Sequence, residues 1–114
     1  MGQLETLAAG VRLTITNPAS ESTSAFGPGV AKLCLGVRDH GSLNASAKTM
    51  RMAYSKAWRI IKDTESSLGV QLLLRDGAHG STLTEEGNLI LDAYLAIQDQ
   101  LSAEGQRLFS EYVS

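Results

Sequence analysis

Apolar residues recur at helical spacing through the middle of the chain, in runs that glycines separate. The first run follows the i, i+3, i+4, i+7 pattern of an amphipathic helix, at Val30, Leu33, Cys34 and Val37. Pro28 suits the first turn of this helix because its missing N–H would have no partner there, and Gly41 suits its end. The pattern therefore predicts a helix from about residue 28 to residue 40.

The next two runs predict a pair of short helices joined by a tight turn. The first begins after the N-cap Ser42, and one face of it carries Leu43, Ala47 and Met50. The second runs from about Tyr54 to Leu68 before the stop at Gly69, with inward residues Ala57, Ile61, Thr64 and Leu68. Such a pair is typical of a helix-turn-helix, whose second helix lies in the DNA major groove. We therefore expect function on the outer face of residues 54–62.

Short strands are predicted on either side of this motif. Residues 11–16 alternate apolar and polar side chains, as a half-buried strand does, and residues 25–26 are a candidate partner strand. Residues 70–74 form a short apolar run, and residues 81–83 return after a glycine-containing turn to complete a hairpin. A hairpin beside a helix-turn-helix is a wing. Residues 1–10 show no clear pattern and predict a flexible arm or a short helix.

From Thr84 onward the pattern predicts one long helix. Thr84 is a suitable N-cap, and acidic residues occupy the first turn, where they favour the positive end of the helix. Near-heptad spacing relates Ile90, Tyr94, Ile97, Leu101 and Leu108. A helix of this length spans about 40 Å, more than so small a domain can cover. We therefore expect residues 84–112 to form a dimerisation helix through those five residues; the alternative is a helix that breaks at Gly105 and folds back over residues 30–37.

Charge is distributed unevenly along the chain. The net charge of -2 argues against nucleic acid, because phosphate contacts need clustered lysine and arginine. However, five of the ten basic residues lie close together with no acid among them: Lys48, Arg51, Lys56, Arg59 and Lys62. From residue 84 onward, six acidic residues accompany one basic residue. This segregation favours a protein with a single DNA-facing surface.

Composition and motifs exclude several other classes of function. The length predicts one domain over residues 1–114, and no apolar run approaches the roughly 20 residues that span a bilayer. The chain has no secretion signal and one cysteine, Cys34, which is expected inward, so we expect a cytoplasmic protein. His40, His79 and Cys34 lack the spacing of metal ligands. No nucleophile and base occur together, so no enzyme activity, cofactor or metal is expected.

Four short motifs lie at the boundaries of the predicted elements: Phe26-Gly27-Pro28-Gly29, Gly41-Ser42-Leu43, Met52-x-Tyr54-x-x-Ala57-Trp58 and Leu83-Thr84-x-x-Gly87. With these motifs, residues 11–112 resemble the N-terminal winged-helix domain of the molybdate-responsive ModE regulators, a relative of the LysR-type DNA-binding domain. The resemblance implies a mainly α fold with a small β wing, a winged helix-turn-helix with a long C-terminal dimerisation helix. It implies a dimeric transcription regulator that binds double-stranded DNA. Molybdate is not expected, because that family binds it in separate C-terminal domains, and we expect no attached effector domain.

Three features depart from the family pattern. Arg51 stands in the turn where glycine is usual, and a side chain forced to positive φ there costs about 1 kcal/mol. Ala53 replaces the serine that caps the recognition helix, and the wing is short. Together with the negative net charge, these features motivate an alternative function, a winged-helix module that binds protein and has lost DNA binding.

The candidate DNA-binding residues lie on the turn, the recognition helix and the wing. Arg59 is the best candidate for a bidentate guanine contact, whereas Lys56 and Lys62 suit phosphates. Trp58 is expected to pack at the edge of the core or against the wing rather than to stack on a base. The full predicted set is Arg51, Tyr54, Ser55, Lys56, Arg59, Lys62, Arg75 and His79.

Overall fold

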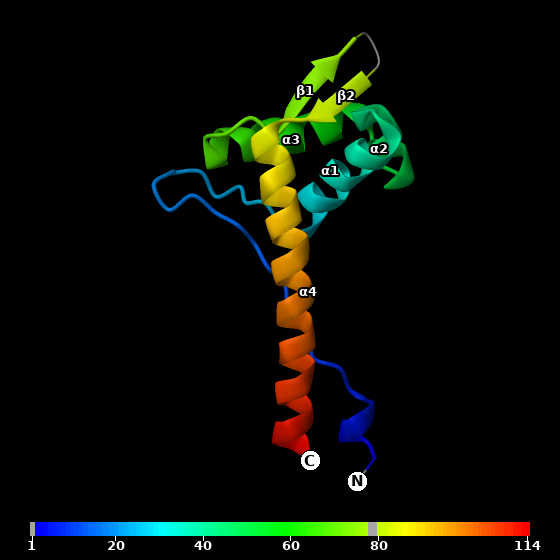
Figure 1. Cartoon of the computed structure of the whole chain (residues 1–114), viewed down its shortest axis with the longest axis vertical. Helices are drawn as coiled ribbons and strands as arrows, with labels where there is room; N and C mark the ends of the chain where they lie inside the picture. Colours follow the sequence, from blue (N-terminus) through cyan, green and yellow to red (C-terminus); the bar gives the residue numbers. More distant parts are fainter. Residues whose placement is uncertain (1, 78–79) are drawn as a thin grey trace.

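The computed structural model describes every residue of the chain except 1, 78 and 79. Figure 1 shows the elements in chain order: η1 (Leu4–Thr6), α1 (Pro28–His40), α2 (Leu43–Thr49), α3 (Tyr54–Leu68), β1 (Leu73–Asp76), β2 (Gly80–Leu83) and α4 (Glu85–Val113). The two strands pair antiparallel, with Leu73 opposite Leu83 and Arg75 opposite Ser81. The fold is therefore the predicted one, a mainly α winged helix-turn-helix followed by a long C-terminal helix.

Helices α1, α2 and α3 pack together beside the wing, and we call this part of the molecule the head. Its core contains side chains from α1, α2 and α3, from the segments before α1 and β1, and from the start of α4: Phe26, Leu33, Cys34, Leu43, Ala57, Ile61, Leu72 and Leu91 are fully buried. Three predicted inward residues of α3, at positions 57, 61 and 64, are buried as expected. The apolar face of each short helix is thus covered by its neighbours, which is what stabilises helices of this length.

Local signals end the helices where the sequence predicted. Gly41 and Gly69 follow α1 and α3 in the left-handed conformation, with φ of 78° and 77°. Ser42 Oγ accepts a hydrogen bond of 3.0 Å from the Ala45 N–H at the start of α2. Thr84 Oγ1 does the same for the Gly87 N–H at 2.8 Å, at the start of α4. Both N-caps are therefore confirmed.

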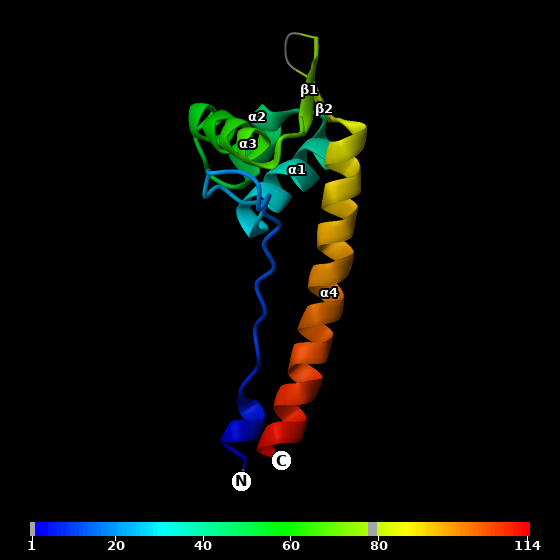
Figure 2. The ribbon, with the colours of Figure 1, turned by 90° about the vertical axis from the view of Figure 1, so that its left-hand side faces the viewer.

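Helix α4 continues without a break through Gly105 to Val113. Its first turns pack against the head. The rest extends away from the head beside residues 2–16, so that the two ends of the described chain lie close together (Figure 2). A Cβ atom on Gly105 would lie 2.9 Å from Val11 Cγ2. The glycine thus permits a close approach between α4 and these residues, and the helix does not break here, contrary to the alternative.

Tyr94 does not belong to an exposed face of α4. Its side chain is only 3% exposed, and its ring packs edge-on against Phe26 with 5.5 Å between the ring centroids. Ile90 is half-buried against the same core. The assignment of Tyr94 to a dimer interface was therefore wrong, because the protein's own head already covers it.

The strand predicted over residues 11–16 does not form. A single antiparallel bridge joins Ile15 to Phe26, with both N–H···O distances at 2.9 Å. Instead of a second strand, a side chain of α4 binds the backbone: Gln98 Oε1 accepts from the Leu13 N–H at 2.9 Å, and Gln98 Nε2 donates to Val11 O at 2.6 Å. Residues 2–16, which we call the N-terminal segment, therefore run along α4 and are extended outside the single turn η1. The short helix expected within residues 1–10 is the single turn η1.

Strand β1 begins three residues later than predicted, at Leu73 rather than Val70. Glu65 of α3 explains the difference, because its Oε2 accepts hydrogen bonds from the Leu72 N–H at 2.7 Å and the Leu73 N–H at 3.2 Å. The chain between α3 and β1 is thus bound to α3. This attachment sets where the wing leaves the head.

Candidate nucleic-acid interface

The turn between α2 and α3 has the strained backbone that the sequence indicated. Arg51 is the only non-glycine residue among those described with positive φ, at 54°. Ala53 occupies the N-cap of α3 without a side-chain hydrogen bond. The Met52 N–H donates to Ala47 O at 2.9 Å and closes the turn. Two of the expected departures, the strain at Arg51 and the missing cap at Ala53, are therefore real features of the structure.

The outer face of α3 is polar, basic and exposed. Its side chains alternate with the buried ones at helical spacing, and those on the surface are Tyr54, Ser55, Lys56, Arg59 and Lys62. Arg51 in the turn and Lys48 at the end of α2 are also exposed. One side of the head thus presents most of the basic residues predicted for DNA binding.

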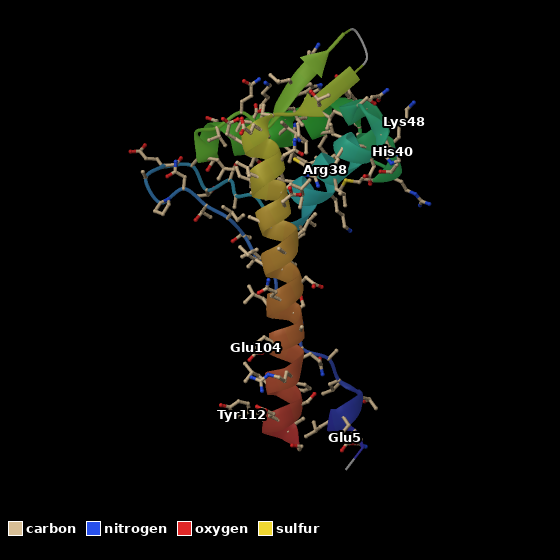
Figure 3. All side chains as sticks on the ribbon, viewed as in Figure 1. Glu5, Arg38, His40, Lys48, Glu104 and Tyr112 are labelled. Carbon is tan, nitrogen blue, oxygen red and sulfur yellow. The ribbon has the colours of Figure 1, made fainter. Side chains whose placement is uncertain are left out.

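The charge segregation of the sequence is seen in part in space. Figure 3 shows Lys48 on the head, whereas Glu104 and Tyr112 lie on the distal part of α4. Glu104 is exposed and forms a hydrogen-bonded ion pair with Arg107, which lowers the pKa of the Glu104 carboxyl.

The wing is attached to the head and closed at its base. The Ser81 N–H of β2 donates to Gly41 O, which follows α1, at 2.9 Å, and the Thr84 N–H after β2 donates to Leu72 O before β1 at 2.9 Å. Arg75 of β1 is exposed and lies on the recognition-helix side of the wing, with its Cζ 5.0 Å from the Trp58 ring centroid. His79 lies outside the described residues. The structure therefore brings Arg75 to the basic face of α3.

Trp58 packs at the edge of the core against the wing, as expected. It is half-buried, and Tyr54 meets it edge-on with 6.2 Å between the ring centroids. Lys62 Nζ lies 5.1 Å from the same ring. The recognition helix and the wing are thus in contact through an aromatic side chain with two cations beside it.

Two hollows flank this contact. One, of 360 Å³, lies where α2, α3 and the wing meet, and its lining includes Asn44, Tyr54 and Arg75. The other, of 620 Å³, lies between α3 and β1 and includes Arg59, Lys62 and Arg75. Sequence reasoning missed Asn44, although its position in the first turn of the helix before the recognition helix was a usable signal. Each hollow also brings together residues of the predicted DNA-binding set: Tyr54 with Arg75 in the first, and Ser55, Arg59 and Lys62 with Arg75 in the second.

Other kinds of site find little support in the structure. Across residues 2–77 and 80–114, no three His, Cys, Asp or Glu side chains gather closely enough to hold a metal ion. Within the same residues, no helix combines the length and the hydropathy needed to cross a membrane.

Comparisons with known proteins agree with this geometry. Residues 31–88 match the model of the bacterial regulatory helix-turn-helix proteins of the lysR family. A crystal structure of a CbnR_DBD–DNA complex is similar, with 27% sequence identity and a TM-score of 0.60, covering 72% of this chain and 93% of that one. No curated protein matches the chain. The narrower resemblance to the ModE regulators stays a prediction.

The matched residues extend from within α1 to the start of α4, and they include the helix-turn-helix, the wing and the basic side chains of the candidate interface. They make up slightly more than half of the chain. The family consists of DNA-binding regulators and not of enzymes. The chain therefore belongs to the lysR family of bacterial regulatory helix-turn-helix proteins, and it is a DNA-binding transcription regulator.

Proposed function

We propose that the protein places α3 in the major groove of double-stranded DNA. The observation that carries the proposal is the division of α3 into two faces: Ala57, Ile61 and Thr64 are buried, whereas Tyr54 and Arg59 are exposed beside three further polar or basic side chains. In a helix-turn-helix, residues near the start of the second helix contact base edges. Arg59 suits guanine, because its planar fork matches the O6 and N7 acceptors.

The remaining basic residues suit the DNA backbone. Lys56 and Lys62 flank the base-reading face of α3, and Arg51 precedes it in the turn. Arg75 extends the basic surface onto the wing, where it would meet the backbone beside the groove. Contacts of this kind fix the register of the protein on the duplex.

The test is fluorescence anisotropy with a labelled duplex over a range of salt concentrations. We expect Lys56→Ala with Arg59→Ala to weaken binding, and the loss of one phosphate contact to reduce the salt slope by about 1. Lys32→Ala, an exposed basic residue of α1, is the control and should leave affinity nearly unchanged. Absence of affinity at low salt would contradict the proposal. In that case, a protein partner that contacts α3 becomes the better explanation.

We also propose that the chain, a single domain over residues 1–114, forms a homodimer through α4. Beyond the head, an apolar stripe remains exposed on this helix: Ile97 by 43%, Leu101 by 40% and Leu108 by 39%. Burial of such a stripe against a second copy would remove apolar surface from water at about 25 cal/mol per Å². A dimer would present two recognition helices to half-sites about one DNA turn apart, roughly 34 Å, or a multiple of it.

Sedimentation equilibrium tests the dimer separately from DNA binding. Leu101→Asp with Leu108→Asp should shift the protein toward the monomer. Leu89→Asp is the matched control, because Leu89 is 64% exposed but lies on a different side of the same helix. A wild-type monomer at tens of micromolar, a range typical of weak association, would contradict the dimer.

A further inference from the structure

Two cations from different elements meet at one aromatic ring. Lys62 Nζ comes from α3 and Arg75 Cζ from β1, and both lie within 5.1 Å of the Trp58 ring centroid. All three side chains line the 620 Å³ groove between the recognition helix and the wing, which Arg59 also lines. The described residues that line this groove include no carboxylate. The groove is therefore a concentration of positive charge.

The neighbouring Glu65 holds the same region together without entering the groove. Its Oε1 lies 3.3 Å from Lys62 Nζ, and its Oε2 accepts the backbone N–H groups of Leu72 and Leu73 just before Arg75. Its side chain is only 11% exposed. Glu65 thus binds the base of the wing to α3, and the ring of Trp58 contacts the guanidinium of Arg75, which extends from β1.

The indole N–H does not explain why a tryptophan stands at position 58. Trp58 Nε1 is buried, and within the described part of the chain it has no acceptor. A buried donor without an acceptor destabilises the fold. The interactions that the residue does make are those of its ring: an edge contact with Tyr54 and the two cation–π contacts. Its role is therefore in the placement of the cations.

We propose that Trp58 is a positioning residue that holds Lys62 and Arg75 around this groove, so that together they bind one phosphate of the DNA backbone. An ammonium and a guanidinium that line one groove complement a phosphate, to which both can give charge-assisted hydrogen bonds. The bound phosphate would connect the recognition helix to the wing. This inference rests on the proposed DNA binding and adds the coupling between the two elements.

A double-mutant cycle on DNA affinity tests the coupling without changing Trp58. Lys62→Ala and Arg75→Ala should each weaken binding by roughly three- to tenfold, the order expected for one phosphate contact. Because both hold the same phosphate, the double variant should be little weaker than either single variant. Lys56→Ala with Arg75→Ala is the control cycle and should be additive. Additive losses for Lys62 and Arg75 would overturn the proposal.

The positioning role of Trp58 is tested in the same assay. Trp58→Leu should weaken binding and lower the salt slope, and it should remove most of the effect of Arg75→Ala while leaving the effect of Lys56→Ala intact. Trp58→Phe keeps an aromatic ring and removes the unpaired N–H, so its affinity should stay close to that of the wild type. If Trp58→Leu instead caused a general loss of structure, the effects of Arg75→Ala and Lys56→Ala on affinity would both shrink, and the melting temperature would fall. Equal effects of Arg75→Ala with and without Trp58 would overturn the role.

Trp58 is also the only tryptophan in the chain, so its fluorescence reports directly on the groove. Duplex DNA should change the emission of the wild type, and Arg75→Ala should reduce that change more than Lys56→Ala does. Inorganic phosphate at the same ionic strength should not reproduce it; if it did, the groove would be a site for free anions and the proposal would fail. Wild-type protein that does not bind DNA would refute the proposed function itself, whereas normal binding with additive cycles refutes only this inference.

Discussion

Gly36 of α1 lies directly against Ser46 of α2. A Cβ atom on Gly36 would lie 2.1 Å from Ser46 Oγ and 2.7 Å from Ser46 Cβ, both shorter than real Cβ contacts. Ser46 Oγ in turn donates a buried hydrogen bond of 2.8 Å to Leu33 O. The first helix of the helix-turn-helix is therefore set against α1 by a glycine that leaves room for a buried hydroxyl.

Gly36→Ala should destabilise the protein. Alanine normally favours a helix over glycine by about 1 kcal/mol, but here the overpacking costs about 1–3 kcal/mol and disturbs the hydrogen bond of Ser46. We expect a net loss of about 1–2 kcal/mol in the free energy of unfolding, measured by urea denaturation. Gly29→Ala in the same helix is the control, because no atom lies within 4 Å of its added Cβ. Equal stabilities of Gly36→Ala and Gly29→Ala would contradict the close contact between α1 and α2 at Gly36 and Ser46.

Arg51→Gly should raise stability and lower DNA affinity. The positive φ of 54° costs a non-glycine residue about 1 kcal/mol, which the substitution recovers in part because glycine also gains freedom in the unfolded chain. The loss of the exposed guanidinium removes the phosphate contact proposed for it. Thermal unfolding and anisotropy measure the two effects. An increase in stability with unchanged affinity would mean that Arg51 does not touch the DNA.

Ala53→Ser should stabilise α3 by about 1 kcal/mol. The backbone of Ala53 already has the extended conformation of an N-cap, with φ of -64° and ψ of 141°, but its side chain offers no acceptor. A serine Oγ would accept one of the free N–H groups in the first turn, as Ser42 and Thr84 do at α2 and α4. Urea denaturation gives the change in stability, with Ser55→Ala on the exposed face of α3 as a control for altered helix propensity. A gain of less than a few tenths of a kcal/mol would mean that the new hydroxyl does not cap the helix.

These positions show which parts of the structure could be predicted from the sequence. Caps, glycine stops and helical spacing act within a few residues, so the bounds of α3 and its exposed face follow from the sequence pattern. The strand expected over residues 11–16 failed because alternation describes only which side chains are buried. It contains no information about Gln98, which binds that backbone from a distant part of the chain.

The candidate site divides in the same way. Helical periodicity placed Arg59 and Lys62 on one face of α3, and this is confirmed. The meeting of Lys62 and Arg75 at Trp58 depends on the path of the chain around Glu65, which no local pattern specifies. Tyr94 shows the reverse error. The heptad spacing is real, but at the start of α4 the Tyr94 ring packs against Phe26 of the same chain and not against a second copy.

Cys34 should be unreactive in the folded protein. Burial raises the pKa of its thiol from 9.0 to about 12, with a further increase from Glu65 and an opposing effect of Arg38. The thiolate is the reactive form, so labelling by a disulfide reagent at pH 8 should proceed only as fast as the protein opens. The unfolded thiol ionises near 9.0 while the folded one keeps its proton, so stability should fall as the pH rises above about 9. Rapid labelling without denaturant would contradict the burial of Cys34. Cys34→Ala is the control for the second effect, and its stability should not fall above pH 9 on account of the thiol.

Two glutamines should hold the N-terminal segment on α4 independently. Gln106 Oε1 accepts from the Ala9 N–H at 2.9 Å, and Gln98 Oε1 accepts from the Leu13 N–H at the same distance. The loss of one such hydrogen bond costs about 1 kcal/mol, which corresponds to roughly fivefold faster amide exchange. Gln98→Ala should therefore accelerate exchange mainly at Leu13, and Gln106→Ala mainly at Ala9, as measured by NMR. Gln100→Ala, at an exposed position of the same helix, is the control and should change neither rate. If both amides already exchange at the rate of an unstructured chain in the wild type, the segment is not held on α4 in solution.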